Sequence, residues 1–94
     1  MNESYIGRHV KATAGHDFNK QYVIIDQQNE YVYLVDGKIR TLDRPKKKKI
    51  KHITLLETID SSLMDKVKNK TVINEEIKRS IKLMQIVTSS KEVE

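Results

Sequence analysis

The chain has 94 residues, of which 37% are hydrophobic and 33% charged, and this composition predicts one globular domain with a modest core. The absence of cysteine excludes disulfides, thiolate zinc sites and cysteine nucleophiles. No apolar run approaches the ~20 residues of a membrane span, and the opening residues lack the apolar core of a signal peptide, so we expect a cytoplasmic protein.

The positive charge is concentrated in one stretch of the chain. Residues 38–52 contain eight Lys or Arg and one acid, Asp43, and carry a net charge of +7. Because the whole chain carries +5, the remaining residues together carry −2. A local positive patch of this kind indicates a polyanionic partner more than it indicates general solubility.

Three runs in the first part of the chain are predicted strands: a short run opened by Gly7, a run rich in β-branched and aromatic residues, and a third that follows it closely. They cover residues 7–12, 20–26 and 30–35. The loop 13–20 between the first two runs contains Gly15, which favours a positive φ angle or a close backbone approach. Lys11, His16 and Lys20 surround this loop with hydrogen-bond donors. It is either an ordinary polar turn or part of a binding surface.

Asp36-Gly37 separates the third run from "KIRTL" (38–42) and is a strong hairpin signal, because a type I′ turn needs positive φ angles at both central residues. Such a turn pairs Val35 with Lys38, Leu34 with Ile39, Tyr33 with Arg40 and Val32 with Thr41. The side chains that face the core on this register are Val32, Leu34 and Ile39. Tyr33 and Arg40 share the wetter face, where the tyrosine either stacks on a base or packs against the arginine.

The stretch "RPKKKKIKHI" (44–53) places four consecutive lysines directly after the only proline of the chain. Pro45 pushes the residue before it towards an extended conformation, so we expect a loop or the bulged start of a strand. Four adjacent ammonium groups repel one another unless an anion meets them. Alternate side chains of an extended segment point in opposite directions, and a wide polyanion such as RNA engages both sets. The alternative is a solvated charge run that only aids solubility.

Residues 50–56, "IKHITLL", supply one more predicted strand. About five short and closely spaced strands predict a small β-barrel. Further along the chain the apolar period becomes helical. The predicted fold is therefore mainly β with C-terminal helices, divided into a barrel at 1–57, a helical extension at 58–88 and a polar tail at 89–94.

Two helices are predicted from apolar spacing and capping residues. The first covers 61–69, after a cap at Ser61 or Ser62, and its apolar positions are Leu63, Met64 and Val67. The second covers 72–87, with Asn74 as its N-cap. Its apolar stripe consists of Ile77, Ile81 and Met84. This stripe either packs on the chain's own barrel or docks a partner helix.

Five segments carry a resemblance to a known family: Gly7 at the start of the first strand, Ala14-Gly15, "YVII", "VDGKIR" and "RPKKKKIKH". Together, over residues 5–56, they resemble the KOW-motif family, and more closely the small bacterial KOW proteins similar to an archaeal and eukaryotic large-subunit ribosomal protein. KOW motifs usually carry a glycine at the position of Asn19. The resemblance implies an SH3-like barrel that binds RNA. We therefore expect ribosomal RNA of the large subunit as the partner, with ribosomal proteins as further partners.

The predicted RNA-binding residues are basic side chains from the charged stretch and from the loop after the first strand. They are Lys46, Lys47, Lys48, Lys49, Lys51, Arg44, Arg40, His52, Lys11, Lys20 and His16. His52 enters through the resemblance, and a structural role beside the basic stretch is its alternative. Phosphate contacts of this kind position a protein on RNA and carry little sequence information.

No catalytic residue, metal site, cofactor or small-molecule substrate is expected, so we expect a non-enzymatic protein. The chain has no nucleophile-elbow motif and no phosphate-binding glycine loop, and its three histidines are scattered without an acidic cluster. The first competing hypothesis is a protein-interaction module of the translation or transcription machinery that docks through the helical extension. The second is attraction of the basic stretch to anionic membranes, for which the sequence shows no lipidation signal or amphipathic anchor.

Overall fold

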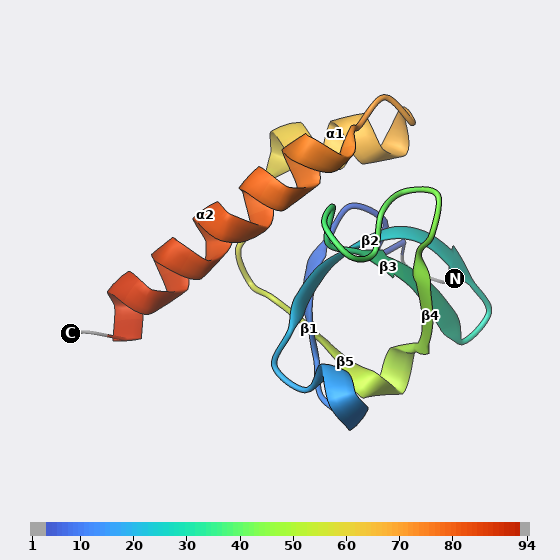
Figure 1. The fold of residues 1–94 in the computed structure, drawn as a ribbon, viewed down its shortest axis with the longest axis horizontal. Coiled ribbons are helices and arrows are strands. Elements are labelled where there is room, and N and C mark those ends of the chain that lie inside the picture. The colour runs from blue at the N-terminus through green and yellow to red at the C-terminus, as the bar shows by residue number, and fades with distance from the viewer. Residues whose placement is uncertain (1–3, 93–94) are drawn as a thin grey trace.

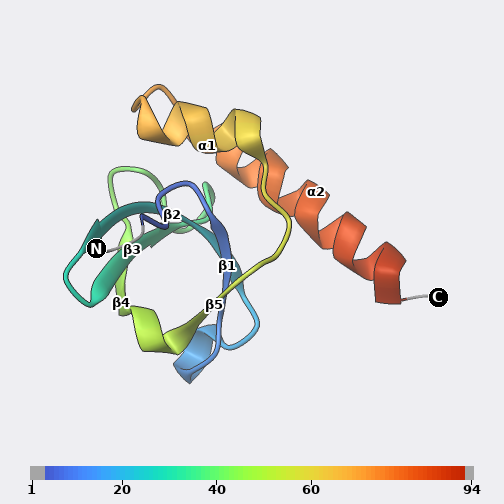
Figure 2. The same cartoon turned by 180° about the vertical axis from the view of Figure 1, so that it is seen from behind.

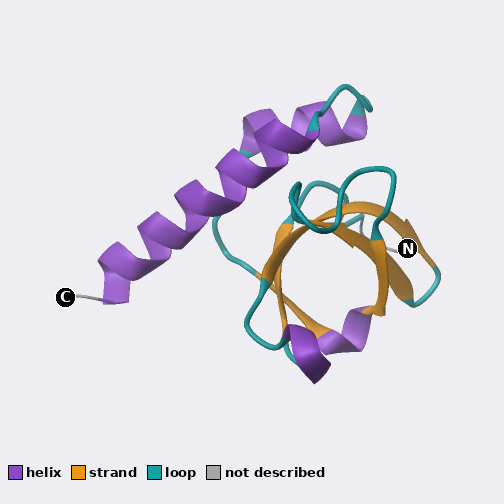
Figure 3. Ribbon diagram, in the orientation of Figure 1, coloured by secondary structure: helices purple, strands orange, loops and turns teal. Residues whose placement is uncertain are grey.

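The computed structural model describes the backbone of residues 4–92 and the side chains of residues 4–86, and in this part five strands precede two α-helices (Figures 1 and 3). The strands are β1 (His9–Ala12), β2 (Gln21–Gln28), β3 (Tyr31–Val35), β4 (Lys46–Lys49) and β5 (Ile53–Leu55). The helices are α1 (Ser61–Lys68) and α2 (Asn74–Glu92), and two short 3-10 helices are η1 (Gly15–Asp17) and η2 (Ile50–His52). The predicted class, mainly β with C-terminal helices, is confirmed.

The five strands form one antiparallel sheet in the order β4-β3-β2-β1-β5. The sheet curls round into a ring, and η2 connects β4 to β5 where the ring is completed (Figures 1 and 2). No ladder joins β4 to β5 in the described part of the chain, so these two strands are the edges of the sheet. An edge strand exposes unpaired backbone groups, which natural proteins protect with charged side chains and proline.

The interior of the curled sheet holds the first of two apolar clusters. Its buried members are Val10, Ala12, Tyr22, Ile24, Val32 and Leu34. They alternate along β1, β2 and β3 because successive side chains of a strand point to opposite faces. Full burial of a Val, Leu or Ile side chain stabilises the fold by roughly 1.5–3 kcal/mol. This cluster therefore holds the sheet in its curled form.

The second cluster lies between the outer face of the sheet and the two helices. Its buried members are Val23, Val35, Leu63, Val67, Ile77 and Ile81. Met84, the third residue of the predicted α2 stripe, is 8% exposed. The structure thus confirms that the stripe packs against the chain itself. Beyond this contact α2 extends away from the sheet towards its C-terminal end (Figures 1 and 2).

The predicted hairpin at Asp36-Gly37 is wrong. The Asp36 carboxylate folds the following residues into a compact loop, because its Oδ1 accepts hydrogen bonds from the backbone N–H groups of Lys38, Ile39 and Arg40 at 2.8–3.0 Å. Residues 38–42 form no strand, and Ile39, predicted in the core, is 70% exposed. The partner of β3 is instead the lysine run. Val32 and Leu34 do face the core, as predicted.

The predicted helix caps are also corrected. Asp60, rather than Ser61 or Ser62, caps α1, because its Oδ1 accepts the Leu63 N–H at 3.1 Å. The Asn74 side chain accepts the N–H of Leu42 at 2.8 Å, which fastens the loop before β4 to the start of α2. α2 continues to Glu92, so residues 89–92 of the predicted tail are helical, and residues 93–94 lie outside the described part. No described helix is long and apolar enough to cross a membrane.

Candidate nucleic-acid interface

The four-lysine run is a regular edge strand, β4, and not the loop or the bulged start of a strand that we expected after Pro45. Its partners in β3 are, in order, Lys46 with Leu34, Lys47 with Tyr33, Lys48 with Val32 and Lys49 with Tyr31. Residues directly opposite one another in an antiparallel pair point to the same face. Because Leu34 and Val32 lie in the inner cluster, Lys46 and Lys48 point inward, whereas Lys47 and Lys49 point outward.

The inward lysines meet a carboxylate from a distant part of the chain. Asp17, in η1, forms an ion pair with Lys46, and its Oδ2 lies 3.6 Å from the Lys48 Nζ atom. The Lys48 ammonium also donates to the Ala14 carbonyl at 3.1 Å, and the Tyr22 hydroxyl donates to Asp17 Oδ1 at 3.1 Å. These contacts cover one end of the curled sheet and tie the loop that contains η1 to β4.

The electrostatics of this inner cluster follow from its geometry. The hydrogen bond from Lys46 lowers the pKa of Asp17, assisted by Tyr22 and by the charge of Lys48, although burial of the carboxylate acts the other way. Burial and the adjacent Asp17 carboxylate raise the pKa of Tyr22 to about 12. Asp17 is therefore ionised at neutral pH, and its single negative charge is shared by two lysines that the sequence analysis assigns to RNA binding.

The outward lysines remain available to a partner. The Nζ atom of Lys47 lies 4.4 Å from the centroid of the Tyr31 ring, a cation–π contact on the outer surface. Lys47 is exposed and Lys49 half-buried, and neither forms an ion pair with a carboxylate in the described part of the chain. The outer side of the sheet edge thus presents two free positive charges on a platform of Tyr31 and Tyr33.

The other predicted RNA-binding residues lie in four parts of the fold. Arg44 and Lys51 are exposed just before and just after β4, and the half-buried His52 ends η2. Lys11 lies in β1, which β2 and β3 separate from β4 in the sheet, so the structure does not join it to the lysine strand. The exposed His16 and Lys20 lie in and after η1, in the loop that Asp17 holds against β4. Arg40 is half-buried, and its carbonyl accepts the Asp36 and Gly37 N–H groups.

Two features of this surface were not predicted from the sequence: the ion pairs of Asp17 and the contact of Tyr31 with a lysine. Asp17 is one polar residue of the predicted turn at 13–20, and the two lysines that it pairs with lie about thirty residues further along the chain. Tyr31 lies beside the lysines because the lysine run is a strand that pairs with β3, and the sequence did not predict this pairing. The sequence signal for the division of the lysines was the alternation of side chains in an extended segment. It predicts that every second lysine of the run points to the opposite face.

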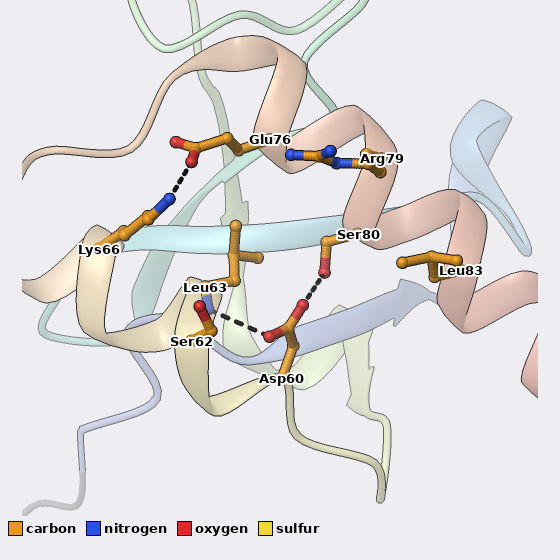
Figure 4. A pocket seen from close by; sticks show the side chains of 8 residues that line it. All are labelled: Asp60, Ser62, Leu63, Lys66, Glu76, Arg79, Ser80 and Leu83. Carbon is orange, nitrogen blue, oxygen red and sulfur yellow. Dashed lines mark hydrogen bonds and ion pairs between the residues drawn. The ribbon is translucent and has the colours of Figure 1, made fainter.

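A second polar cluster connects the sheet to the helices, and Figure 4 shows its Ser80–Asp60 hydrogen bond. The Ser80 hydroxyl, in α2, donates to Asp60 Oδ2 at 2.7 Å, and it lies 2.8 Å from Nε2 of His9 in β1. Because the serine proton goes to Asp60, the His9 Nε2 must donate to Ser80, which leaves His9 Nδ1 without a hydrogen-bond partner. This direction is the reverse of the one that activates a nucleophilic serine. The cluster holds three parts of the fold together: β1, the segment that precedes α1, and helix α2.

Burial and hydrogen bonding determine the charge states of His9 and Asp60 in this cluster. Burial of the fully enclosed His9 lowers its pKa, and the nearby Asp60 carboxylate only partly opposes the effect. Burial also acts to raise the pKa of Asp60, but hydrogen bonds from the Ser80 hydroxyl and from the Leu63 N–H bring it below its ordinary value. At neutral pH the cluster therefore consists of a neutral histidine and an ionised aspartate.

Neither a metal centre nor a known relative identifies the site. The described residues contain no group of three or more His, Cys, Asp or Glu side chains that could hold a metal ion. No protein-family model matches the chain, and no curated protein matches it.

Proposed function

We propose that this protein is a non-enzymatic RNA-binding protein of the KOW type, which binds RNA phosphates with the outer side of its lysine edge strand. The observation that carries the proposal is the division of β4 into two sides. Lys46 and Lys48 share the Asp17 carboxylate as their ion-pair partner on the inner face of the curled sheet, whereas Lys47 and Lys49 face outward without a carboxylate partner in the described structure.

Further exposed positive charges lie next to this strand in the chain. Arg44 and Lys51 are exposed on either side of β4, and neither has an ion pair within the described residues. Clustered ammonium and guanidinium groups on one side of a small domain are the electrostatic footprint of nucleic-acid binding. Contacts to phosphate carry little sequence information, so RNA shape would select the binding site.

Protection of the sheet edge explains part of the lysine content. Lysines on an edge strand and a proline beside it prevent edge-to-edge pairing with other chains. Pro45 and the lysines of β4 fulfil this role whatever the protein binds. Edge protection does not require the additional exposed charges at Arg44 and Lys51, and these favour an anionic partner.

The proposed RNA is ribosomal RNA of the large subunit. This choice is supported by the resemblance of residues 5–56 to ribosomal KOW proteins, and the positive edge is compatible with it. A protein-interaction module of the translation or transcription machinery is the second candidate. It is favoured by Leu83 and Ile86, which are each 54% exposed on α2 and lie outside the buried stripe.

Sucrose-gradient sedimentation of a lysate tests the proposal. The wild type is expected to comigrate with large ribosomal subunits, and raised salt is expected to release it. The variant Lys47→Gln/Lys49→Gln should remain in the light fractions, while Lys82→Gln, in which an exposed lysine of α2 is changed, should behave as the wild type. Comigration of the double variant would contradict the proposal. A complex that survives nuclease treatment would favour the protein-interaction candidate.

A further inference from the structure

A groove with a mostly apolar lining lies on the same outer surface as the lysine strand. It has a volume of about 640 Å³ and lies between β2, the loop before β4, and the turn that joins α1 to α2. Its lining includes Ile25, Leu42, Val67 and Val72, with Asp26, Lys68 and Lys70 as its charged residues. An apolar groove of this size with a few polar groups has the character of a ligand site.

The walls of the groove are fixed by packing. Val67 is 5% exposed, and Ile25, Leu42 and Val72 pack against the outer apolar cluster. The backbone N–H of Leu42 donates to the Asn74 side chain at 2.8 Å, which holds the loop wall against α2. The groove is therefore formed before any ligand arrives, and binding does not have to order its walls.

A β-bulge turns Asp26 towards this surface. The ladder between β2 and β3 shifts register between Ile24 and Asp26, so that Ile25 packs on the outer cluster and Asp26 also faces outward, opposite Tyr33. Bulges of this kind re-aim side chains and are common beside binding sites. One Asp26 oxygen accepts the Gln27 N–H at 2.8 Å, which orients the carboxylate.

The turn after α1 keeps a lysine where glycine is favoured. Lys70 has a φ angle of +59°, and its N–H donates to the Val67 carbonyl at 3.1 Å. The left-handed conformation costs a residue with a Cβ atom roughly 1–2 kcal/mol, which is why glycine usually ends helices in this way. Lys70 therefore places a positive charge beside the groove at the expense of local stability.

One row of paired residues connects the groove to the lysine strand. Asp26 pairs with Tyr33, and Tyr33 pairs with Lys47, so the three residues form one row across β2, β3 and β4 on the outer face. A chain of phosphates that lies along β4 can therefore direct a neighbouring nucleotide across Tyr33 into the groove. Lys68 and Lys70 are available there for the next phosphate.

We propose that this groove receives one unpaired guanine of the bound RNA, with Asp26 as the residue that selects it; this inference rests on the proposed RNA-binding function. An ionised carboxylate only accepts hydrogen bonds. On its Watson–Crick edge guanine presents two adjacent donors, N1–H and the exocyclic amine, which match two carboxylate lone pairs. Adenine and cytosine each place an acceptor beside their amine and repel the second oxygen. Aliphatic side chains on the groove walls contact the faces of the base.

The test measures binding of the full chain to four RNA hairpins that differ in a single unpaired base: guanine, adenine, uracil or inosine. Wild type is expected to bind the guanine hairpin about tenfold more tightly than the adenine hairpin, since one bidentate contact gives discrimination of this order. Inosine, which lacks the exocyclic amine, should lie between them. The variant Asp26→Asn keeps an oxygen for the Gln27 N–H and should bind guanine and adenine within about twofold of each other.

Two further variants separate this inference from the proposed function. Lys70→Gly relieves the left-handed strain, so it should fold at least as stably as wild type while it binds all four hairpins more weakly. Lys47→Gln/Lys49→Gln should weaken binding to all four equally. Equal, salt-sensitive binding of the four hairpins by the wild type would overturn the guanine inference alone. Absence of all RNA binding would overturn both proposals, and guanosine monophosphate that bound as tightly as the guanine hairpin would overturn the choice of RNA as occupant.

Discussion

Lys47 holds its ammonium group 4.4 Å from the centre of the Tyr31 ring, on the outer face of an edge strand whose inward lysines, Lys46 and Lys48, pair with Asp17. Tyr31 lies directly opposite Lys49, so the Lys47 contact runs diagonally across the two strands. A cation above an exposed aromatic ring gains about 0.5–1 kcal/mol. The contact keeps the Lys47 charge on the outer surface, and Asp17 fixes the inner lysines in the opposite direction.

Replacement of Asp17 by asparagine is expected to destabilise the fold. The change leaves the ammonium groups of Lys46 and Lys48 without their counter-charge, and the side chains of Asp17 and Lys48 are only 12% and 11% exposed. Breaking a buried pair by removal of one partner costs about 3 kcal/mol. Urea unfolding at pH 7 measures the loss. Asp43→Asn, which changes an exposed carboxylate, is the control and should stay within about 0.5 kcal/mol of wild type.

The same carboxylate predicts a loss of stability in acid. The pKa of Asp17 is lower in the folded protein than its ordinary value of 3.8, so the unfolded state binds more protons between the two pKa values. The contribution of Asp17 is therefore complete above pH 3.8 and is lost as the pH falls through the folded-state pKa. The Asp17→Asn variant should lose less stability than wild type between pH 5 and pH 2, and an equal loss would exclude this role.

His9 predicts a second pH effect in a separate window. Its pKa is lower in the folded protein than the ordinary 6.5, so the unfolded state takes up the proton first as the pH falls. The contribution of neutral His9 is complete above pH 6.5 and decreases below it. The urea midpoint of wild type should be lower at pH 5 than at pH 7.5. His9→Gln, which leaves His16 and His52 in place, should show a smaller change, and an unchanged pH dependence would contradict the assignment.

Gly37 and Gly15 form a matched pair for a test of the loop that replaced the predicted hairpin. Both have positive φ angles, +79° and +77°. A Cβ atom on Gly37 would clash with the Asn74 carbonyl oxygen and lie 2.9 Å from the Lys78 backbone nitrogen, whereas one on Gly15 meets nothing within 4 Å. Gly15→Ala should cost about 1 kcal/mol of stability from backbone strain alone, and Gly37→Ala several times more. Equal losses in thermal or urea unfolding would show that the loop does not pack on α2.

The sequence predicted those parts of the fold that depend on local apolar patterns. Val32 and Leu34 alternate in a β-branched run, and Ile77 and Ile81 recur at helical spacing, so their burial followed from periodicity alone. The lysine strand had no such pattern. Lysine is disfavoured in strands, and β4 exists because the curled sheet supplies β3 as a partner, which is a tertiary effect.

The hairpin prediction at Asp36-Gly37 is wrong because an Asp-Gly pair is typical of two different local structures. Aspartate followed by glycine suits a hairpin turn, and it also suits a loop in which the aspartate accepts the next backbone N–H groups. The outcome depended on the contact of Gly37 with α2, about forty residues away. For the candidate site, the sequence located the positive stretch, but only the register with β3 shows which lysines face outward.

The salt dependence of RNA binding tests the central claim most directly. Affinity for a purified large-subunit ribosomal RNA should be measured between 50 and 200 mM salt, where each phosphate contact contributes about 0.7–0.9 to the slope of log affinity against log salt. Lys47→Gln/Lys49→Gln is expected to reduce this slope by about 1.5. The variant Lys46→Gln/Lys48→Gln should be less stable than the wild type. Under conditions in which this variant is folded, the slope of its RNA binding should equal that of the wild type. Equal slopes for the outward variant and the wild type, or the same reduction in the inward variant, would contradict the account.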